Sequence, residues 1–432
     1  MSLLAILLAG WGLVAAGFPR RPADGVERAF RAAIAVALGI GAWSASYAGW
    51  RLAFGESGLA KDVLLAAAGA ASVIAFRLRP PEQVPERESA PRWLWAVFAL
   101  AVAVAAAAFV EHTVRFPDGG WDAWMVWNLR ARFLVRADDL RTAFSPRMAF
   151  LAHQDYPWLV PGVVAQAFAR LGESPLLAPA VAAVFGILAV AVVTLSVARV
   201  QGMRWGLLAG LAVCTLPCFA TFASNQQSDV PLALYFAIAA AILTQAQSRR
   251  ELVLAGFAAG LAMWTKNEGA LYAGCLLAAW LWRARDARGA LAFAAGALPC
   301  TALLLCFKLG LAPSNDLAAF STRTSLVANA LDVRRWAELA LLTARRMVYF
   351  QDFALWVLAA FLLLVSHFRQ LPASVLGTAL LLAFAAYAPI YVLQPHRLDW
   401  IFRTSADRIL IQLWPAVVLA AIPALARTTA RT

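Results

Sequence analysis

The sequence predicts an all-α polytopic membrane protein, and three observations lead to that fold class. Hydrophobic residues make up 62% of the 432 positions and charged residues 14%, so the chain holds more apolar surface than a soluble domain can bury. The apolar residues fall in runs of about 20, the length of a helix that crosses a bilayer. Arginines follow these runs in alternate loops, as the positive-inside rule requires.

Taken in chain order, the runs predict about thirteen transmembrane helices. They lie at 2–18, 29–49, 58–76, 93–110, 176–198, 205–223, 229–246, 251–265, 268–282, 289–311, 351–367, 373–393 and 409–426. Arg20 and Arg21 follow the first run, which favours an uncleaved span with its N-terminus outside. The net charge of +13 comes mostly from arginines of inside loops, which contact anionic lipid, so we expect no nucleic-acid partner.

The segment 77–92 (RLRPPEQVPERESAPR) is the plausible internal linker, because it is rich in proline and mixed charge. It divides the chain into an N-terminal three-span unit with its cytoplasmic linker, 1–92, and a core, 93–432. Three outside segments exceed simple turns: 111–175, 312–350 and 394–408. The working face is therefore expected on the extracytoplasmic side.

The first outside loop, 111–175, opens with FPDGGWDAWMVWNLRARFLV. Gly119 and Gly120 make a flexible turn, and Asp122 starts a helical stretch with apolar side chains all round its axis. A carboxylate held at the membrane boundary can take a proton from a hydroxyl or hold a metal ion. The alternative is that Asp122 caps its helix and pairs with Arg130 or Arg132.

The same loop continues with HQDYPWLVPGVVAQAFARLGESP, where Pro157 and Pro161 bracket the start of a second helix along the membrane. Its entrance carries His153, Gln154, Asp155 and Tyr156. Such a group of donors and acceptors suits recognition of a polyhydroxy substrate. The alternative is an ordinary solvated loop.

Two further polar positions stand at the outer ends of later spans. Asp229, in SNQQSDVPLALYF, is either a helix N-cap before Pro231 or a site residue. Lys266, one of few lysines, lies in GLAMWTKNEGALYAG, where the chain turns at the outer membrane edge beside Asn267 and Glu268. It can meet a phosphate at headgroup level, or it simply snorkels and pairs with Glu268.

The last outside loop, QPHRLDWIFRTSADRILIQLWP, is basic against the trend of the other outside loops. Its basic residues are His396, Arg397, Arg403 and Arg408. Arginines at the headgroup plane suit bidentate binding of a phosphate, with ordinary headgroup contact as the alternative.

In their order and common sidedness these motifs resemble the integral-membrane glycosyltransferases of the GT-C class, specifically the protein-mannosyltransferase and aminoarabinose-transferase-like superfamily. The resemblance covers roughly 93–427 and rests on WDAWMVWNLRARF, HQDYPWLVP, SDVPLALYF, GLAMWTKNEGAL and TSADRILIQLWP. It implies a GT-C-like bundle with interfacial helices in the first outside loop. Many relatives carry Asp-Glu where this chain has Asp122-Ala123, which leaves metal dependence open, and the three spans before Trp93 are additional to the usual plan.

The resemblance implies an inverting glycosyltransferase, hexosyl or pentosyl, with a polyprenyl-phosphate sugar as donor and a glycolipid, polysaccharide or protein as acceptor. Asp122 would be the catalytic base and, if a divalent cation takes part, its ligand. The donor phosphate would be bound by Lys266, Arg397, Arg403 and Arg408. The candidates for substrate binding are Asp118, Trp121, Arg130, His153, Asp155, Tyr156, Asp229, Asn267 and Glu268.

The composition, rich in alanine and arginine and poor in lysine, suggests a bacterium with a GC-rich genome. We therefore expect the cytoplasmic membrane, with the site facing the periplasm or exterior. The alternative function is a transporter or flippase of lipid-linked saccharide, which should place charges near the bilayer midplane. The predicted spans are nearly free of central charges, which favours the enzyme.

Overall fold

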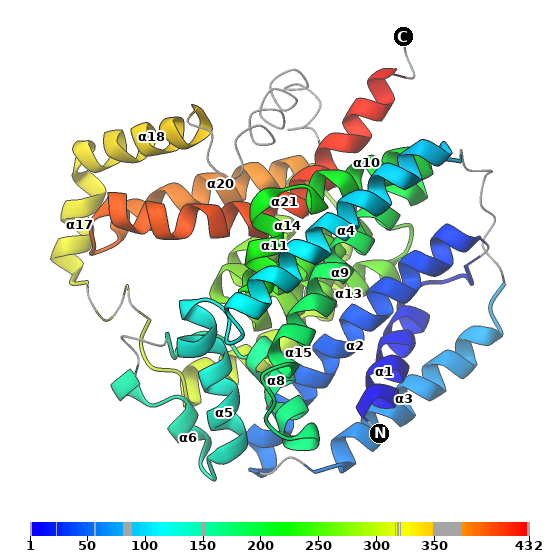
Figure 1. Ribbon diagram of the computed structural model, residues 1–432, viewed down its shortest axis with the longest axis horizontal. Coiled ribbons are helices and arrows are strands. Elements are labelled where there is room, and N and C mark those ends of the chain that lie inside the picture. Colours follow the sequence, from blue (N-terminus) through cyan, green and yellow to red (C-terminus); the bar gives the residue numbers. More distant parts are fainter. Residues whose placement is uncertain are drawn as a thin grey trace.

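A computed structural model of the chain describes residues 2–22, 24–55, 58–80, 89–148, 153–315, 317, 319, 321–348 and 374–429. Within these residues every regular element is a helix, and the helices pack side by side into one bundle (Figure 1). The first half comprises α1 (Ser2–Gly17), α2 (Gly25–Phe54), α3 (Ala60–Arg77), α4 (Arg92–Arg115), η1 (Ala123–Trp127), α5 (Asn128–Arg136), α6 (Leu140–Ala143), η2 (Pro146–Met148), α8 (Leu159–Leu171) and α9 (Leu177–Gln201). The second half comprises α10 (Met203–Cys214), α11 (Pro217–Ser224), α12 (Asp229–Gln245), α13 (Arg249–Thr265), α14 (Asn267–Arg283), α15 (Ala287–Gly310), α17 (Arg323–Leu331), α18 (Val333–Val348), α20 (Val375–Leu393) and α21 (Leu398–Thr429).

The all-α polytopic class is confirmed, because each predicted span within the described ranges falls on one helix or, at 205–223, on two. Six of the described helices are long and apolar enough to cross a membrane: α2, α4, α9, α15, α20 and the first part of α21. A bent pair, α10 with α11, would make a seventh. The count of thirteen stays a prediction, and the span predicted at 351–367 lies outside the described residues.

The predicted span 205–223 is two helices rather than one. The axes of α10 and α11 differ in direction by 68°. Pro217 stands in the first turn of α11, where a proline fits because its missing N–H is not needed. The Thr215 hydroxyl donates back to the Leu211 carbonyl at the end of α10. Pro217 therefore accounts for the break, which the uninterrupted hydrophobicity of the segment does not reveal.

Helix α12 forms the centre of the bundle. It is buried along almost its whole length and contacts α9, α13 and α21. A helix that is apolar on all sides is typical of such a position. Because α12 begins with Asp229, this central helix carries a carboxylate at one of its ends.

The N-terminal helices pack closely on one another and on the core. In α1 an added Cβ at Gly10 would lie 1.8 Å from the Ala35 carbonyl oxygen, so only glycine permits this approach to α2. Helix α2 in turn contacts α8 and α9, and Figure 1 shows it running toward the short helices of the first outside loop. The division of the chain near residue 92 stays a prediction.

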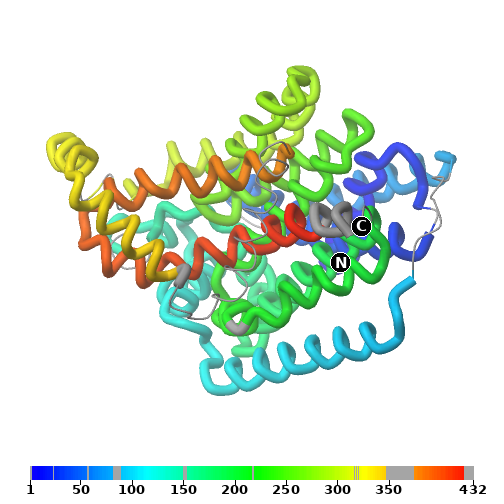
Figure 2. Tube along the Cα trace, turned by 90° about the horizontal axis from the view of Figure 1, so that it is seen from above, coloured from blue at the N-terminus to red at the C-terminus, as the bar shows by residue number. Residues whose placement is uncertain are grey.

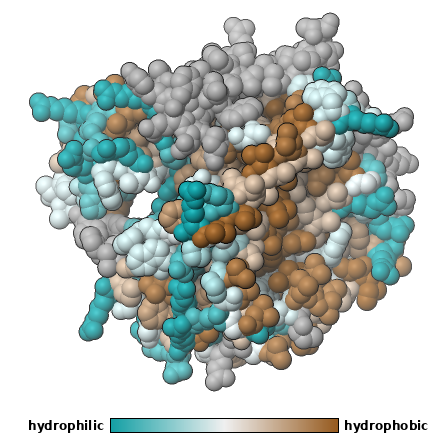
Figure 3. All heavy atoms as spheres, viewed as in Figure 1, coloured by the Kyte–Doolittle hydropathy of each residue, from teal (hydrophilic) through white to brown (hydrophobic). Residues whose placement is uncertain are grey.

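Helix α4 lies at the periphery. Figure 2 shows it along one edge of the molecule, and its contacts are mainly with α10 and α11. Of its 18 most apolar consecutive residues, only 6% are buried within the protein. In Figure 3 hydrophobic residues cover much of the face on which α4 lies, as expected of a surface solvated by lipid tails.

Candidate active site

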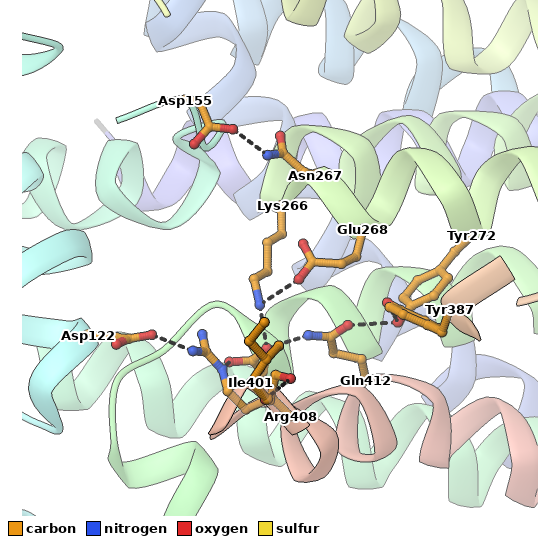
Figure 4. A network of polar contacts seen from close by, with 12 residues as sticks. Asp122, Asp155, Lys266, Asn267, Glu268, Tyr272, Tyr387, Ile401, Arg408 and Gln412 are labelled. Carbon is orange, nitrogen blue, oxygen red and sulfur yellow. Dashed lines mark hydrogen bonds and ion pairs between the residues drawn. The ribbon is translucent and has the colours of Figure 1, made fainter. Parts of the chain in front are cut away.

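Five charged side chains from four separate segments form one cluster, which Figure 4 shows from close by. The charged cluster consists of Asp122, Asp229, Lys266, Glu268 and Arg408. Arg408 on α21 bridges two carboxylates, with its Nη1 2.6 Å from Asp122 Oδ2 and its Nε 3.1 Å from Asp229 Oδ2. Lys266 Nζ lies 2.9 Å from Asp229 Oδ1 and 3.0 Å from Glu268 Oε1. Residues predicted from distant motifs therefore share one site.

Asp229 is the fully buried anion at the centre of the cluster. Ser228, not Asp229, occupies the N-cap position of α12, and it makes no side-chain capping bond. The Asp229 carboxylate instead pairs with Lys266 and Arg408 and accepts a hydrogen bond from the Gln412 amide. Asp229 is therefore the counter-ion of two cations and does not act as a simple helix cap.

Lys266 joins α13 to α14 in a single extended residue, with φ −160° and ψ 157°. Because the chain reverses there, the side chain is directed into the protein, where it is 3% exposed. An amine at that burial does not snorkel to water, although the predicted pair with Glu268 is present. The helix boundaries predicted around this turn agree with the structure to within one residue.

Asp122 precedes η1, a π-helical turn, and makes no capping bond there. Its carboxylate is 21% exposed and pairs with Arg408 rather than with either arginine of its own loop. Arg132 lies near Asp118 and Glu173 instead. π-helical turns are rare and occur often at functional sites, because they re-aim a side chain within a helix.

Arg130 fastens the two motifs of the first outside loop to each other. Its guanidinium donates to the main-chain oxygens of Tyr156, at 2.9 Å, and His153, at 2.8 Å. Burial lowers the pKa of Arg130 to about 10, while the Asp155 carboxylate and Tyr156 oppose that effect. Arg130 thus remains charged at neutral pH and holds the loop in place.

Tyr156 lies between two aromatic rings, stacked on Trp127 at a centroid distance of 5.6 Å and on His153 at 5.4 Å. Lys266 Nζ is 5.7 Å from the centre of its ring. Burial, with Glu268 the next contributor, raises the pKa of Tyr156 well above its usual value. The phenol therefore stays protonated and can serve as a hydrogen-bond donor.

Asp155 belongs to a second polar group next to the charged cluster. Its Oδ2 accepts from Asn267 Nδ2 at 2.6 Å. Lys308, near the end of α15, donates to the Asp155 main-chain oxygen and lies 3.3 Å from Oδ2. Asp155 and Asn267 were predicted as site residues. Lys308 was not predicted, although the scarcity of lysine in this chain could have drawn attention to it.

Three uncharged residues behind Asp229 were also missed. The Gln412 carbonyl accepts from the Tyr272 hydroxyl at 2.7 Å, and that hydroxyl lies 2.6 Å from the Tyr387 hydroxyl (Figure 4). Gln412 follows Arg408 by four positions, and residues four apart share a face of a helix. The signal was therefore present in the spacing.

Other predicted residues lie outside the charged cluster. Arg397 and Arg403 are 85% and 71% exposed and both pair with Asp399. Asp118 is 61% exposed beside Arg132, and the exposed Trp121 packs edge-on against Trp124. Their predicted roles stay predictions.

The carboxylates do not form a metal site. Within the described ranges no three His, Cys, Asp or Glu residues are arranged so that they could hold a metal ion, because the carboxylates of the charged cluster face its cations. Asp122, the residue predicted to hold a divalent cation, already has Arg408 as its partner.

Several buried polar atoms around the cluster have no hydrogen-bond partner among the described residues. They include Glu268 Oε2, Ser228 Oγ and the indole nitrogen of Trp127. Buried polar groups in proteins are nearly always paired with protein, water or ligand. These atoms are thus candidates for contact with a bound molecule rich in hydroxyl groups.

A comparison with sequence models of known families supports the resemblance over the middle of the chain. The sequence model of a family described as dolichyl-phosphate-mannose-protein mannosyltransferase matches residues 156–308, a segment that includes Asp229 and Lys266. No curated protein sequence matches the chain. A crystal structure of ArnT from Cupriavidus metallidurans bound to undecaprenyl phosphate is similar, with 18% sequence identity and a TM-score of 0.46 over 78% of this chain. The chain spans 61% of that protein.

Proposed function

We propose that the chain is a membrane glycosyltransferase that transfers a sugar from a polyprenyl-phosphate donor to an extracytoplasmic acceptor. The observation that carries the proposal is the charged cluster, in which a carboxylate of the first outside loop and two cations from distant segments meet. The family match over the middle of the chain supports the same reaction class. We place the protein in a bacterial inner membrane, with the cluster facing the periplasm.

In the proposed mechanism Asp122 is the general base, because its carboxylate is partly exposed at the edge of the cluster. It takes the proton of an acceptor hydroxyl, and the hydroxyl oxygen attacks the anomeric carbon of the donor sugar. The bond from that carbon to the phosphate oxygen breaks, and polyprenyl phosphate leaves with the electron pair. Direct displacement of this kind inverts the anomeric configuration.

Lys266 and Arg408 bind the phosphate as it leaves. Two cations, Lys266 buried and Arg408 largely buried, aimed at the position where negative charge develops stabilise the transition state more than the ground state. The guanidinium of Arg408 can hold a phosphate through two parallel N–H groups, while the Lys266 amine acts as a point charge. Arg397 and Arg403 are exposed at the start of α21, and we propose that they contact the lipid phosphate before it reaches the charged cluster.

The charges of the cluster imply an order of binding. Its three carboxylates and two cations sum to a net charge of −1 when all are ionised. An arriving phosphate must therefore draw a cation away from its carboxylate partner. Arg408 can turn Nη1 from Asp122 to the phosphate while Nε stays on Asp229, and this frees Asp122 to act as a base. The donor is thus proposed to bind before the acceptor.

The sugar itself would satisfy the unpaired atoms beside the cluster. Glu268 Oε2 and Ser228 Oγ can accept hydroxyl protons, and the Trp127 indole can donate to a hydroxyl oxygen. Asp155 and Asn267, paired with each other beside the charged cluster, are proposed to line the same region.

The test is an assay of the purified protein with several polyprenyl-phosphate sugars, following release of the lipid phosphate. Asp122→Asn should leave the protein folded and abolish transfer, because the amide cannot take the proton. Asp139→Asn is the matched control, since Asp139 caps α6 in the same loop and asparagine caps equally well. Normal turnover by the Asp122→Asn protein removes Asp122 from the mechanism. Movement of a lipid-linked sugar across vesicles with no covalent product would identify a flippase instead.

A further inference from the structure

We infer that the N-terminal three-helix unit, α1 to α3, positions the first outside loop, with Arg51 as the positioning residue for Asp122. The inference rests on the proposed role of Asp122 as base. It concerns the part of the chain that is additional to the usual plan of the superfamily that the sequence resembles. The contacts that carry it lie between α2, α3 and the loop helices α5 and α8.

Arg51, in the last turn of α2, caps the C-terminal end of α5. Its Nη1 donates to the main-chain oxygen of Leu134 at 3.2 Å, and its Nη2 donates to that of Ala137 at 3.4 Å. The Tyr47 hydroxyl also donates to the Leu134 oxygen, at 3.3 Å. The last carbonyls of a helix lack partners within it and carry partial negative charge, so a buried guanidinium is well placed there.

The helix that Arg51 caps carries Asp122 at its other end. The elements η1 and α5 run without interruption from Ala123 to Arg136, and Asp122 immediately precedes them. The chain enters through Gly119, whose φ of +78° favours glycine. The Gly120 N–H donates to the Asn225 carbonyl at 3.3 Å. The helix is therefore held at both ends, and its rotation about its own axis sets the direction of the Asp122 carboxylate.

Helix α8, which follows the Tyr156 motif, is fastened to the same unit. Lys61 on α3 donates to the Gln166 side chain at 2.6 Å. Asp62 is fully buried and pairs with Arg170 at 2.6 Å. Helix α8 thus contacts both α2 and α3, and the end of α5 is held by α2.

The consequence for catalysis is one of alignment. A misplacement of a reacting group by about 1 Å can lower a rate by about 100-fold. Without Arg51 the C-terminal end of α5 loses its charged cap, and Asp122 is free to turn away from Arg408. Donor binding depends on Lys266 and Arg408, and their ion pairs among the described residues are with Asp122, Asp229 and Glu268, none of which belongs to the N-terminal unit. The defect should therefore appear in kcat rather than in KM for the donor.

The experiment compares Arg51→Met, Arg51→Lys and Arg31→Met in the full-length protein. Arg31 is the matched control, because it is equally buried near the other end of α2 and pairs with Glu27 at 2.5 Å, away from the loop. We expect Arg51→Met to lower kcat by at least about 10-fold with a change of less than about threefold in donor KM. Hydrogen exchange of the α5 amides should rise in the same variant. Arg51→Lys should recover part of both, and Arg31→Met should change neither.

The inference is overturned if Arg51→Met keeps the wild-type kcat and wild-type α5 exchange, or if Arg31→Met reproduces its defects. Where Arg51→Met does not fold, Tyr47→Phe decides by the same two measurements, since it removes a single hydrogen bond to α5. Exchange of the α5 amides requires no turnover. A wild-type chain without transferase activity would sink the proposed function, while unchanged exchange in the variants would sink the positioning role.

Discussion

Replacing Asp229 with asparagine should destabilise the protein strongly, because the change leaves the buried Lys266 and the largely buried Arg408 without their common counter-ion. The amide has nearly the shape of the carboxylate, so packing at the start of α12 is preserved. What is lost is the negative charge 2.9 Å from Lys266 Nζ and 3.1 Å from Arg408 Nε. The substitution therefore isolates the electrostatic contribution.

The size of the effect can be worked out from these distances. Two unit charges about 3 Å apart attract by about 5 kcal/mol at an effective dielectric constant of about 20. The cost of removing the charges from water offsets much of that attraction, and removing one partner of a buried pair destabilises proteins by about 3–5 kcal/mol. Asp229 is fully buried, so the upper part of this range applies.

The assay is the free energy of unfolding in mixed detergent micelles, with Asp286→Asn as control. Asp286 also stands at a helix N-terminus and pairs with an arginine, Arg249, but it is accessible to water. Adding Lys266→Met to Asp229→Asn removes one of the two cations that have lost Asp229 as a partner and should restore much of the lost stability. The reasoning is refuted if Asp229→Asn costs no more than Asp286→Asn, or if the double variant is no better than the single one.

Three further predictions can be checked with the same assays. Arg408→Lys should lower transfer by about 100-fold or more, because a single ammonium cannot span two carboxylates, and an unchanged rate would contradict the bridging role. Arg403→Ala should raise donor KM at most about threefold and leave kcat unchanged, since the side chain is exposed and bound to Asp399; a large fall in kcat would place it in the cluster. A hydrogen bond from the Gly289 N–H lowers the pKa of Asp286 in the folded protein. The wild-type protein should therefore exceed the Asp286→Asn variant in free energy of unfolding by the full amount above about pH 4, and this difference should vanish as the pH falls through the lowered pKa. A difference that persists in acid would argue against this.

Much of the architecture could be predicted from the sequence because helix ends in a membrane protein are marked by polar residues between apolar runs. Lys266 interrupts two such runs, and the structure ends one helix at Thr265 and begins the next at Asn267. Where the mark was a proline within a continuous run, at Pro217, the prediction merged two helices into one span.

The partners within the site were harder to predict than its members. The pairing considered for Asp122, as the alternative to a catalytic role, was with Arg130 or Arg132, its neighbours in the chain, and it pairs with Arg408 from the last helix. Pairing across helices depends on which faces the bundle brings together, and a single sequence does not contain that information. Within one helix the spacing is informative, and the missed Gln412, four positions after Arg408, could have been found from it.

The peripheral position of α4 has a consequence for how the protein is made. Its main neighbours, α10 and α11, are synthesised only after the whole first outside loop and α9. Until they emerge from the ribosome, α4 has to reside in the bilayer without these neighbours. The most apolar 18 residues of α4 have a mean hydropathy of 2.4, so this helix is stable in lipid before its neighbours are present. Biogenesis can thus insert this helix independently and add its neighbours later.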